Sequence, residues 1–211
     1  MQQSKEQIMK RIIGGGVVVL VTGSLFVAGY TVTSRCNLNA ISSHASEQVA
    51  VPTSPLRASI KFQLEATPDE VFDYISSEQT LPEWMPGLES LRYDHSNVIT
   101  PGVLGKGSRR TMMFGEQSEL EEIVEFNRPT VVAYRILEGV PVKNHLAVFI
   151  IEESDRNRST VTWNQYFDIE RSSASGWLMP FMVRRFINDA QDNLFNKFGG
   201  IAIESCGSTL L

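Results

Sequence analysis

Residues 58–76, ASIKFQLEATPDEVFDYIS, join a strand pattern directly to a helix pattern. Apolar residues at every second position over 58–66 predict a half-buried strand. The sequence TPDE at 67–70 then carries the signals of a helix start, with Thr67 as the N-cap and proline in the first helical position. Glu70 stands where a capping-box glutamate belongs. This opening unit therefore predicts a strand followed by a capped helix.

The rest of the chain continues with one short helix, a series of strands and one long helix. The short helix is expected over 78–85 and ends at a Pro-Gly pair. The strands are expected at 88–95, 108–114, 119–126, 131–137, 145–151 and 161–168. Apolar residues recur every three or four positions from Met179 to Phe198, which predicts an amphipathic helix. A meander of antiparallel strands curls, so the long helix can cover its concave face and leave an apolar cavity between them.

The composition excludes several classes of protein. The chain has 211 residues and a formal net charge of −5, whereas nucleic-acid-binding proteins need a basic surface, so no nucleic-acid partner is expected. Two cysteines cannot build a disulfide framework or a cysteine-based zinc site. Three widely spaced histidines disfavour a metal enzyme, and no phosphate loop or dinucleotide motif is present. We therefore expect neither a metal nor a cofactor.

The N-terminal segment differs from the rest of the chain. Residues 12–34 carry no charge and are long enough, as a helix, to cross a hydrocarbon core about 30 Å thick. We expect an uncleaved signal anchor, with a cleaved signal peptide and a buried soluble helix as the alternatives. Lys5, Lys10 and Arg11 precede the segment, whereas Arg35 is the only lysine or arginine among the 20 residues that follow it. This bias predicts a single-pass membrane protein with its N-terminus in the cytoplasm and its main domain outside.

The expected organisation has five parts: a cytoplasmic tail (1–11), a transmembrane anchor (12–34), a linker (35–57), a ligand-binding domain (58–200) and a C-terminal tail (201–211). Cys36 and Cys206 flank the domain. If the domain lies outside the cytoplasm these cysteines could pair, but their separation cannot be judged from sequence, so this stays open.

The motifs of the domain, taken in order, resemble a known superfamily. They are TPDEVFDYIS at 67–76, LPEWMPG at 81–87, Gly105-x-Gly107, ELEEIVEFNRPTVVAYRI at 119–136, STVTWNQYFD at 159–168, and the long C-terminal helix. Together they resemble the START-like or Bet v 1-like (SRPBCC) superfamily, and most closely its polyketide cyclase/dehydrase and lipid-transport proteins. The resemblance covers about residues 58–200 and leaves out the apolar N-terminal segment.

The resemblance implies an α+β helix-grip fold, in which a curved antiparallel sheet of about seven strands wraps around a long C-terminal helix. Members hold hydrophobic ligands such as lipids, sterols, polyketides or quinones in the groove. Many have no demonstrated chemistry. The resemblance therefore implies a class of ligand rather than a reaction.

Candidate ligand-binding residues are those expected on the concave side. Tyr134 shares a predicted strand face with Val132 and Ile136, so its hydroxyl is a candidate hydrogen-bond donor, while Arg135 faces the other way. Methionines fill irregular apolar space and tolerate varied ligands, although ordinary core packing is the alternative for them and for Trp84. The full candidate set is Trp84, Met85, Tyr93, Arg110, Met112, Phe114, Glu122, Tyr134, Trp163, Met182 and Phe186.

Glu122 is the strongest candidate for chemistry. On a regular strand it shares a face with Leu120, Val124 and Phe126, where desolvation would raise the pKa of its carboxyl. An acid–base site would then pair Glu122 with Tyr134 or His95. The alternatives are a bulge that turns Glu122 outward, or pairing with Arg109 or Arg110 on the preceding strand.

The histidines have plainer interpretations. His95 at a strand end and His145 at a strand start are both expected to be solvated. Three functions remain: a membrane-tethered protein that binds a hydrophobic small molecule, an enzyme of cyclase or dehydratase type, and an assembly module with a filled core. A cavity smaller than the ~300 Å³ that a drug-sized ligand needs would favour the last.

Overall fold

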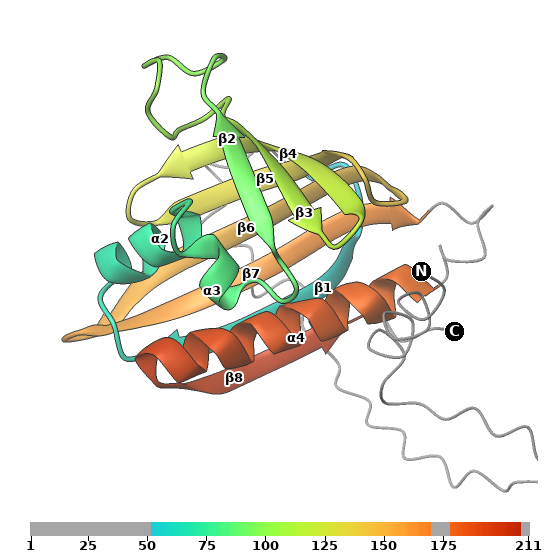
Figure 1. Cartoon of the computed structure of the whole chain (residues 1–211). Helices are drawn as coiled ribbons and strands as arrows, with labels where there is room; N and C mark the ends of the chain where they lie inside the picture. Colours follow the sequence, from blue (N-terminus) through green and yellow to red (C-terminus); the bar gives the residue numbers. More distant parts are fainter. Residues whose placement is uncertain (1–51, 170–177, 208–211) are drawn as a thin grey trace, which may run out of the picture. The chain divides into compact units, whose positions relative to one another are not determined.

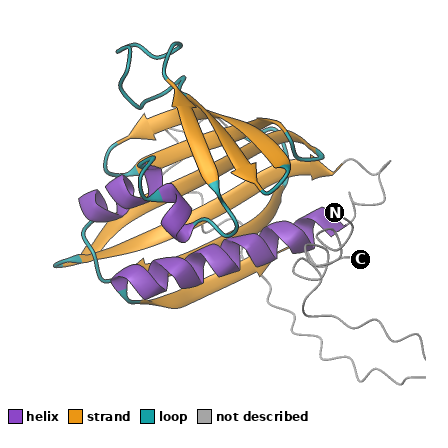
Figure 2. Ribbon diagram, viewed as in Figure 1, coloured by secondary structure: helices purple, strands orange, loops and turns teal. Residues whose placement is uncertain are grey.

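The computed structural model describes residues 52–169 and 178–207, with side chains up to Glu204. Its elements, in chain order, are β1 (Leu56–Leu64), α2 (Pro68–Ser76), α3 (Leu81–Trp84), β2 (Ser90–Asp94), β3 (Arg109–Phe114), β4 (Gln117–Asn127), β5 (Val131–Glu138), β6 (Val142–Asp155), β7 (Arg158–Ile169), α4 (Met179–Phe198) and β8 (Gly200–Gly207) (Figure 1). Figure 2 shows that strands form most of the domain and that α4 is its one long helix. The predicted α+β class is confirmed.

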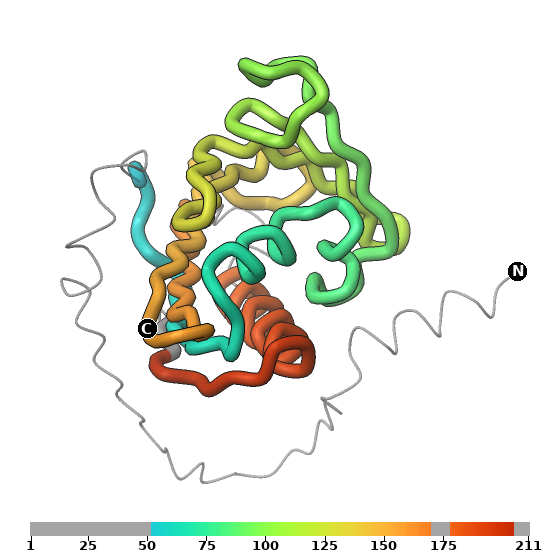
Figure 3. The backbone as a smooth tube through the Cα atoms, turned by 90° about the vertical axis from the view of Figure 1, so that its left-hand side faces the viewer, coloured from blue at the N-terminus to red at the C-terminus, as the bar shows by residue number. Residues whose placement is uncertain are grey.

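The strands form one antiparallel sheet in the order β2-β3-β4-β5-β6-β7-β1-β8. The sheet curves, and α4 lies inside the curve, as the view turned by 90° shows (Figure 3). This is the arrangement of the predicted helix-grip fold. The two short helices α2 and α3 lie beside the C-terminal half of α4 and complete the concave side (Figure 1).

The opening unit forms as predicted. β1 alternates its side chains, and Thr67 caps α2 by accepting a hydrogen bond from the backbone N–H of Glu70. The Glu70 carboxylate in turn accepts a hydrogen bond from the backbone N–H of Thr67, at 2.9 Å, so the capping box is complete. The second helix, α3, is shorter than predicted and has four residues.

The sheet has eight strands, one more than expected. Gly199 takes a positive φ of 73° and ends α4, which allows the chain to reverse. Residues 200–207 then run back as β8 along the outer side of β1. Strand β1 therefore lies between β7 and β8, inside the sheet rather than at its edge.

The core lies between the inner face of the sheet and the helices. Ile187, Ala190 and Leu194 recur along α4 and are fully buried. Phe62 of β1 meets Phe195 of α4 edge to face, with ring centres 5.8 Å apart. The three- and four-residue spacing of apolar positions thus places the predicted face of α4 against the sheet.

The predicted anchor at 12–34 and the tail at 1–11 lie outside the described residues, as does most of the linker, including Cys36. Within 52–169 and 178–207, the structure contains no helix with the length and apolar character needed to span a bilayer.

Candidate functional site: a cavity with a polar end

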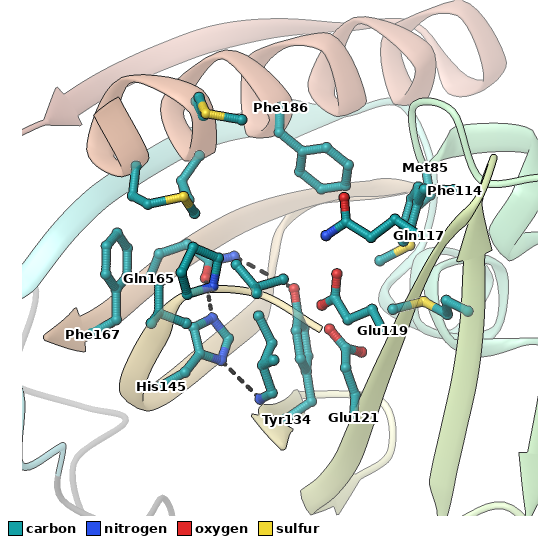
Figure 4. A pocket seen from close by; sticks show the side chains of 18 of the residues that line it. Met85, Phe114, Gln117, Glu119, Glu121, Tyr134, His145, Gln165, Phe167 and Phe186 are labelled. Carbon is teal, nitrogen blue, oxygen red and sulfur yellow. Dashed lines mark hydrogen bonds between the residues drawn. The ribbon is translucent and has the colours of Figure 1, made fainter. Parts of the chain in front are cut away.

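A cavity of about 420 Å³ opens between the inner face of the sheet and α4. It exceeds the ~300 Å³ that a drug-sized ligand needs. Most of its lining is apolar, and the polar side chains gather on β4, β5, β6 and β7 (Figure 4). The lining residues are Met85, Pro86, Met112, Phe114, Gln117, Glu119, Glu121, Tyr134, Ile136, Val140, Pro141, Val142, His145, Gln165, Phe167, Met179, Met182, Val183 and Phe186.

Several residues proposed from the sequence line this cavity. They come from the α3–β2 connection, the β3 strand, the β5 strand and the first turns of α4, and they are Met85, Met112, Phe114, Tyr134, Met182 and Phe186. Met182 lines the cavity while keeping half of its surface exposed, and its neighbour Phe181 is 61% exposed. The start of α4 therefore presents apolar side chains both to the cavity and to the outside.

The two candidate tryptophans belong to the core behind the cavity. Trp84 and Trp163 contact each other edge to face, with ring centres 5.9 Å apart, and both are fully buried. Trp163 also stacks on Phe149 at 4.4 Å. These side chains support the cavity wall without lining the cavity, which was the alternative considered for Trp84.

Tyr93 and Arg110 lie one layer behind the polar end. The Tyr93 hydroxyl donates to the carbonyl oxygen of Ser76 at 3.0 Å and accepts a long hydrogen bond of 3.4 Å from Arg110. Arg110 in turn places its guanidinium over the ring of Tyr134, 4.8 Å from the ring centre. Neither Tyr93 nor Arg110 is among the lining residues; both support residues that are.

Glu122 lies on the outer face of the sheet and does not reach the cavity. Its carboxylate pairs with Arg135 on β5 and, at 3.5 Å, with Arg109 on β3. The pairing of β4 with β5 shifts by one residue between Ile123 and Glu125. Because of this bulge Glu122 does not share a face with Phe126, which packs inward against Phe72. Both alternatives raised for Glu122, a bulge and an arginine partner, are present.

His95 also lies away from the cavity. Its Nδ1 is 2.9 Å from the hydroxyl of Ser108, and its ring stacks on Tyr93 with ring centres 5.4 Å apart. With Glu122 on the outer face and His95 at the end of β2, the acid–base pairs proposed from the sequence do not form in the described structure.

Apart from Tyr134, the polar end of the cavity consists of residues that sequence reasoning did not select: Gln117, Glu119, Glu121, His145 and Gln165. The expectation of a solvated His145 is wrong, because the side chain is 8% exposed. Asn144 adopts a positive φ of 50°, and the pairing of β6 with β7 is irregular between Lys143 and Leu146. This irregularity turns His145 inward. The only sequence feature that could have indicated an irregular strand here is the Lys143-Asn144 pair before it, because asparagine tolerates a positive φ.

Arg110 and Glu121 form a buried ion pair beside the cavity. The guanidinium Nε donates to a carboxylate oxygen at 2.5 Å, and the two side chains are 3% and 2% exposed. Burial is the largest single effect and lowers the pKa of Arg110, but the charge of Glu121, together with Tyr93 and Tyr134, outweighs burial and raises that pKa. The arginine is therefore a permanent cation whose charge is already matched.

Glu119 lies next to Glu121 on the same face of β4, two residues away. Burial, followed by the negative charge of Glu121 and a hydrogen bond to it, raises the pKa of the Glu119 carboxyl to about 9. Two neighbouring carboxyls that share one arginine cannot both ionise at low cost. At neutral pH, Glu119 is therefore protonated.

His145, Gln165 and Tyr134 form a hydrogen-bonded chain along the floor of the cavity (Figure 4). Burial lowers the pKa of His145, so the imidazole is neutral. Burial and the charge of Glu121 raise the pKa of Tyr134, so the phenol keeps its proton. The chain can orient and hydrogen-bond a polar group in the cavity.

Solved structures show the same fold at low sequence identity. The protein XoxI from Bacillus cereus is 21% identical, with a TM-score of 0.55 over 67% of this chain and 95% of that chain. An HSP90 activator from Plasmodium falciparum is 12% identical, with a TM-score of 0.53 over 70% of this chain and 99% of that chain. At these identities the likeness supports the fold alone.

Among curated proteins, no sequence matches this chain significantly. The profile of the family described as "Polyketide cyclase / dehydrase and lipid transport" matches residues 55–198, which span strands β1 to β7, the residues that line the cavity and all of α4. Because this match covers more than half of the chain, the chain belongs to the polyketide cyclase/dehydrase and lipid-transport family.

Proposed function

We propose that this chain binds an apolar small molecule in the cavity between the sheet and α4. The observation that carries the proposal is the cavity itself, about 420 Å³ in volume, with apolar walls and a hydrogen-bonding end. The family and the fold suggest the same class of ligand. A filled core, expected of an assembly module, would not leave such a space.

Apolar burial supplies the binding energy in this proposal. Each Å² of apolar surface removed from water contributes about 25 cal/mol before the entropy costs of association. Aromatic and methionine side chains form most of the wall, notably Met112, Phe114 and Phe186. The polar end contributes orientation rather than affinity.

The proposal requires no catalysis. An enzyme of cyclase or dehydratase type was expected to use Glu122, which faces away from the cavity. Glu119 and Glu121 face inward in its place, but one is paired with Arg110 and the other is protonated. Neither is an available general base at neutral pH.

We also propose that residues 12–34 anchor the protein in a membrane, with the main domain outside the cytoplasm. The uncharged sequence of that segment and the preceding positive charges support the anchor and its orientation. The exposed apolar side chains Phe181 and Met182 at the start of α4 suit exchange of an apolar ligand at a bilayer. Extraction of expressing membranes at alkaline pH tests the anchor: release of the full-length chain into the soluble fraction would contradict it.

Native mass spectrometry of the full-length chain, held in an amphipol polymer, tests the binding function. Detergent is avoided because its monomers compete for an apolar cavity. We expect a co-purifying or added apolar molecule on the wild type and on Val103→Trp, since Val103 lies in the exposed β2–β3 loop. We expect none on Val183→Trp, because Val183 lines the cavity and the larger side chain occupies it. Binding that is absent from the wild type, or equal in both variants, would overturn the proposal.

A further inference from the structure

We propose that the ligand of this cavity is an uncharged lipophile with a carbonyl-type oxygen that accepts a hydrogen bond from the Tyr134 hydroxyl, and that the cavity discriminates against lipids carrying a carboxylate or a phosphate. This inference rests on the binding function proposed above and names the class of ligand for the same site. Two independent features carry it: the direction of a hydrogen-bond chain and the balance of charge.

The hydrogen-bond chain starts at a group that can only donate. The backbone N–H of Ile136 donates to Nδ1 of His145 at 3.1 Å. Nδ1 therefore holds no proton, and in the neutral ring the proton lies on Nε2. Nε2 donates in turn to the side-chain oxygen of Gln165, at 2.8 Å.

This order fixes the role of the last member. Because the oxygen of Gln165 accepts from His145, its amide nitrogen is the atom directed at Tyr134, and it donates to the phenolic oxygen over 3.4 Å. The hydroxyl of Tyr134 then acts as an acceptor within the chain. Its own proton has no acceptor among the described residues and is available to the cavity that Tyr134 lines. A ligand oxygen that accepts a hydrogen bond completes the chain.

The charges around the polar end leave nothing to neutralise an anion. None of the described residues that line the cavity is a lysine or an arginine. Arg110, behind the lining, is already paired with Glu121. Protonated Glu119 and neutral His145 add no charge, so the Glu121 carboxylate, paired with Arg110, is the charged group among the described lining residues. A ligand carboxylate or phosphate would lose its water, gain no counter-ion and lie near the Glu121 carboxylate, which is unfavourable.

A ligand with an ammonium group carries the opposite charge, and the test must also be able to detect its binding. An amine could bind as an ion pair only if Glu119 gave up the proton that its raised pKa holds at neutral pH, and only after the ammonium lost its water, so we expect weak binding. Tight binding of an amine would contradict the proposed class. An uncharged carbonyl oxygen requires no change of protonation at Glu119 or His145.

Four probes with the same alkyl chain distinguish these cases: 2-dodecanone, dodecane, dodecanoate and dodecylamine. The readout is displacement of pyrene, an uncharged hydrocarbon, from the full-length chain in amphipol, with the Val183→Trp variant giving the background from the polymer. We expect 2-dodecanone to bind more tightly than dodecane by about fivefold, the worth of one hydrogen bond. Dodecanoate and dodecylamine should bind more weakly than dodecane.

Tyr134→Phe provides the test of the named atom. It removes the hydroxyl and keeps the ring, so we expect the fivefold advantage of the ketone over dodecane to disappear while dodecane binds as before. Tyr166→Phe is the matched control, because Tyr166 packs in a separate cluster with Val131 and Leu146 and does not line the cavity. Tyr166→Phe should leave the binding of both 2-dodecanone and dodecane unchanged.

The outcomes separate the two proposals. If neither pyrene nor dodecane binds above the Val183→Trp background, the binding function itself is wrong. If both bind, but dodecanoate or dodecylamine binds best or Tyr134→Phe leaves the ketone advantage intact, the binding function stands and the ligand class proposed here is wrong.

Discussion

Glu121 and Glu122 are consecutive residues whose carboxylates have opposite surroundings. Glu121 faces the core and pairs with Arg110, and both side chains are almost fully buried. Glu122 faces outward and pairs with Arg135 and Arg109, which are 53% and 43% exposed. The same chemical change at these two positions therefore compares a pair in which both partners are buried with a carboxylate, 13% exposed, whose arginine partners are in contact with water.

The buried arginine requires one ionised carboxylate. In Glu121→Gln, Glu119 can ionise and take over the pairing, so the loss of stability should be partial. The double variant Glu119→Gln/Glu121→Gln removes both carboxyls and leaves Arg110 unpaired, which should lower the free energy of unfolding by about 3–5 kcal/mol. Glu122→Gln should cost less than about 1 kcal/mol. Denaturant unfolding measures all three, and equal losses in the double variant and Glu122→Gln would contradict the assignment.

Glu119 also predicts how stability changes with pH. Its pKa is about 9 in the folded protein, against 4.5 for an ordinary glutamate. Between these values the folded chain binds a proton that the unfolded chain has lost. The contribution of this group is therefore complete below pH 4.5 and is lost as the pH rises to about 9.

Unfolding measured across that range checks the sign. The free energy of unfolding of the wild type should fall towards alkaline pH, and that of Glu119→Gln should fall less. The stability of the variant relative to the wild type should therefore increase with pH. Glu116→Gln, in the exposed β3–β4 turn, is the matched control and should follow the wild type. Parallel curves of stability against pH for wild type and Glu119→Gln would show that the pKa of the Glu119 carboxyl is not raised.

At the scale of elements, period-two reasoning found the strands and failed where a strand is irregular. In β4 it placed Phe126 inward correctly but assigned Glu122 to the same face, because a bulge between Ile123 and Glu125 is invisible in the alternation of side chains. In β6 the positive φ of Asn144 had the same effect on His145. The apolar wall of the cavity was therefore predictable from the sequence, and much of its polar end was not.

The turn from α4 into β8 depends on a glycine pair. A Cβ on Gly200 would lie 2.2 Å from the backbone oxygen of Gln63, which has no room to move because β1 is held on both sides. Gly200→Ala should therefore destabilise the protein by more than about 1 kcal/mol. Gly105→Ala is the matched control, since nothing lies within 4 Å of the position of its Cβ. Urea midpoints compare the two, and equal midpoints would contradict the close approach.

At the scale of the whole molecule, the fold was predictable because its signals are redundant. The capping box, the strand spacing and the period of α4 point together to a sheet curled around one helix, and an error in any single strand leaves that conclusion intact. The eighth strand was missed because IAIESCG at 201–207 is short and carries only two large apolar residues. It forms because β1 offers an unpaired edge and the glycine turn delivers the chain to it.

The position of β1 also decides when the protein can fold. Its partners are β7 and β8, so that Ser59, for example, pairs with Asn164 in one direction and with Cys206 in the other. During synthesis the first strand of the domain emerges from the ribosome long before either neighbour exists, and it must wait with an apolar face exposed. The sheet can close only after the last residues of β8 have left the exit tunnel, so β1 stays without either of its partners until nearly the whole domain has emerged.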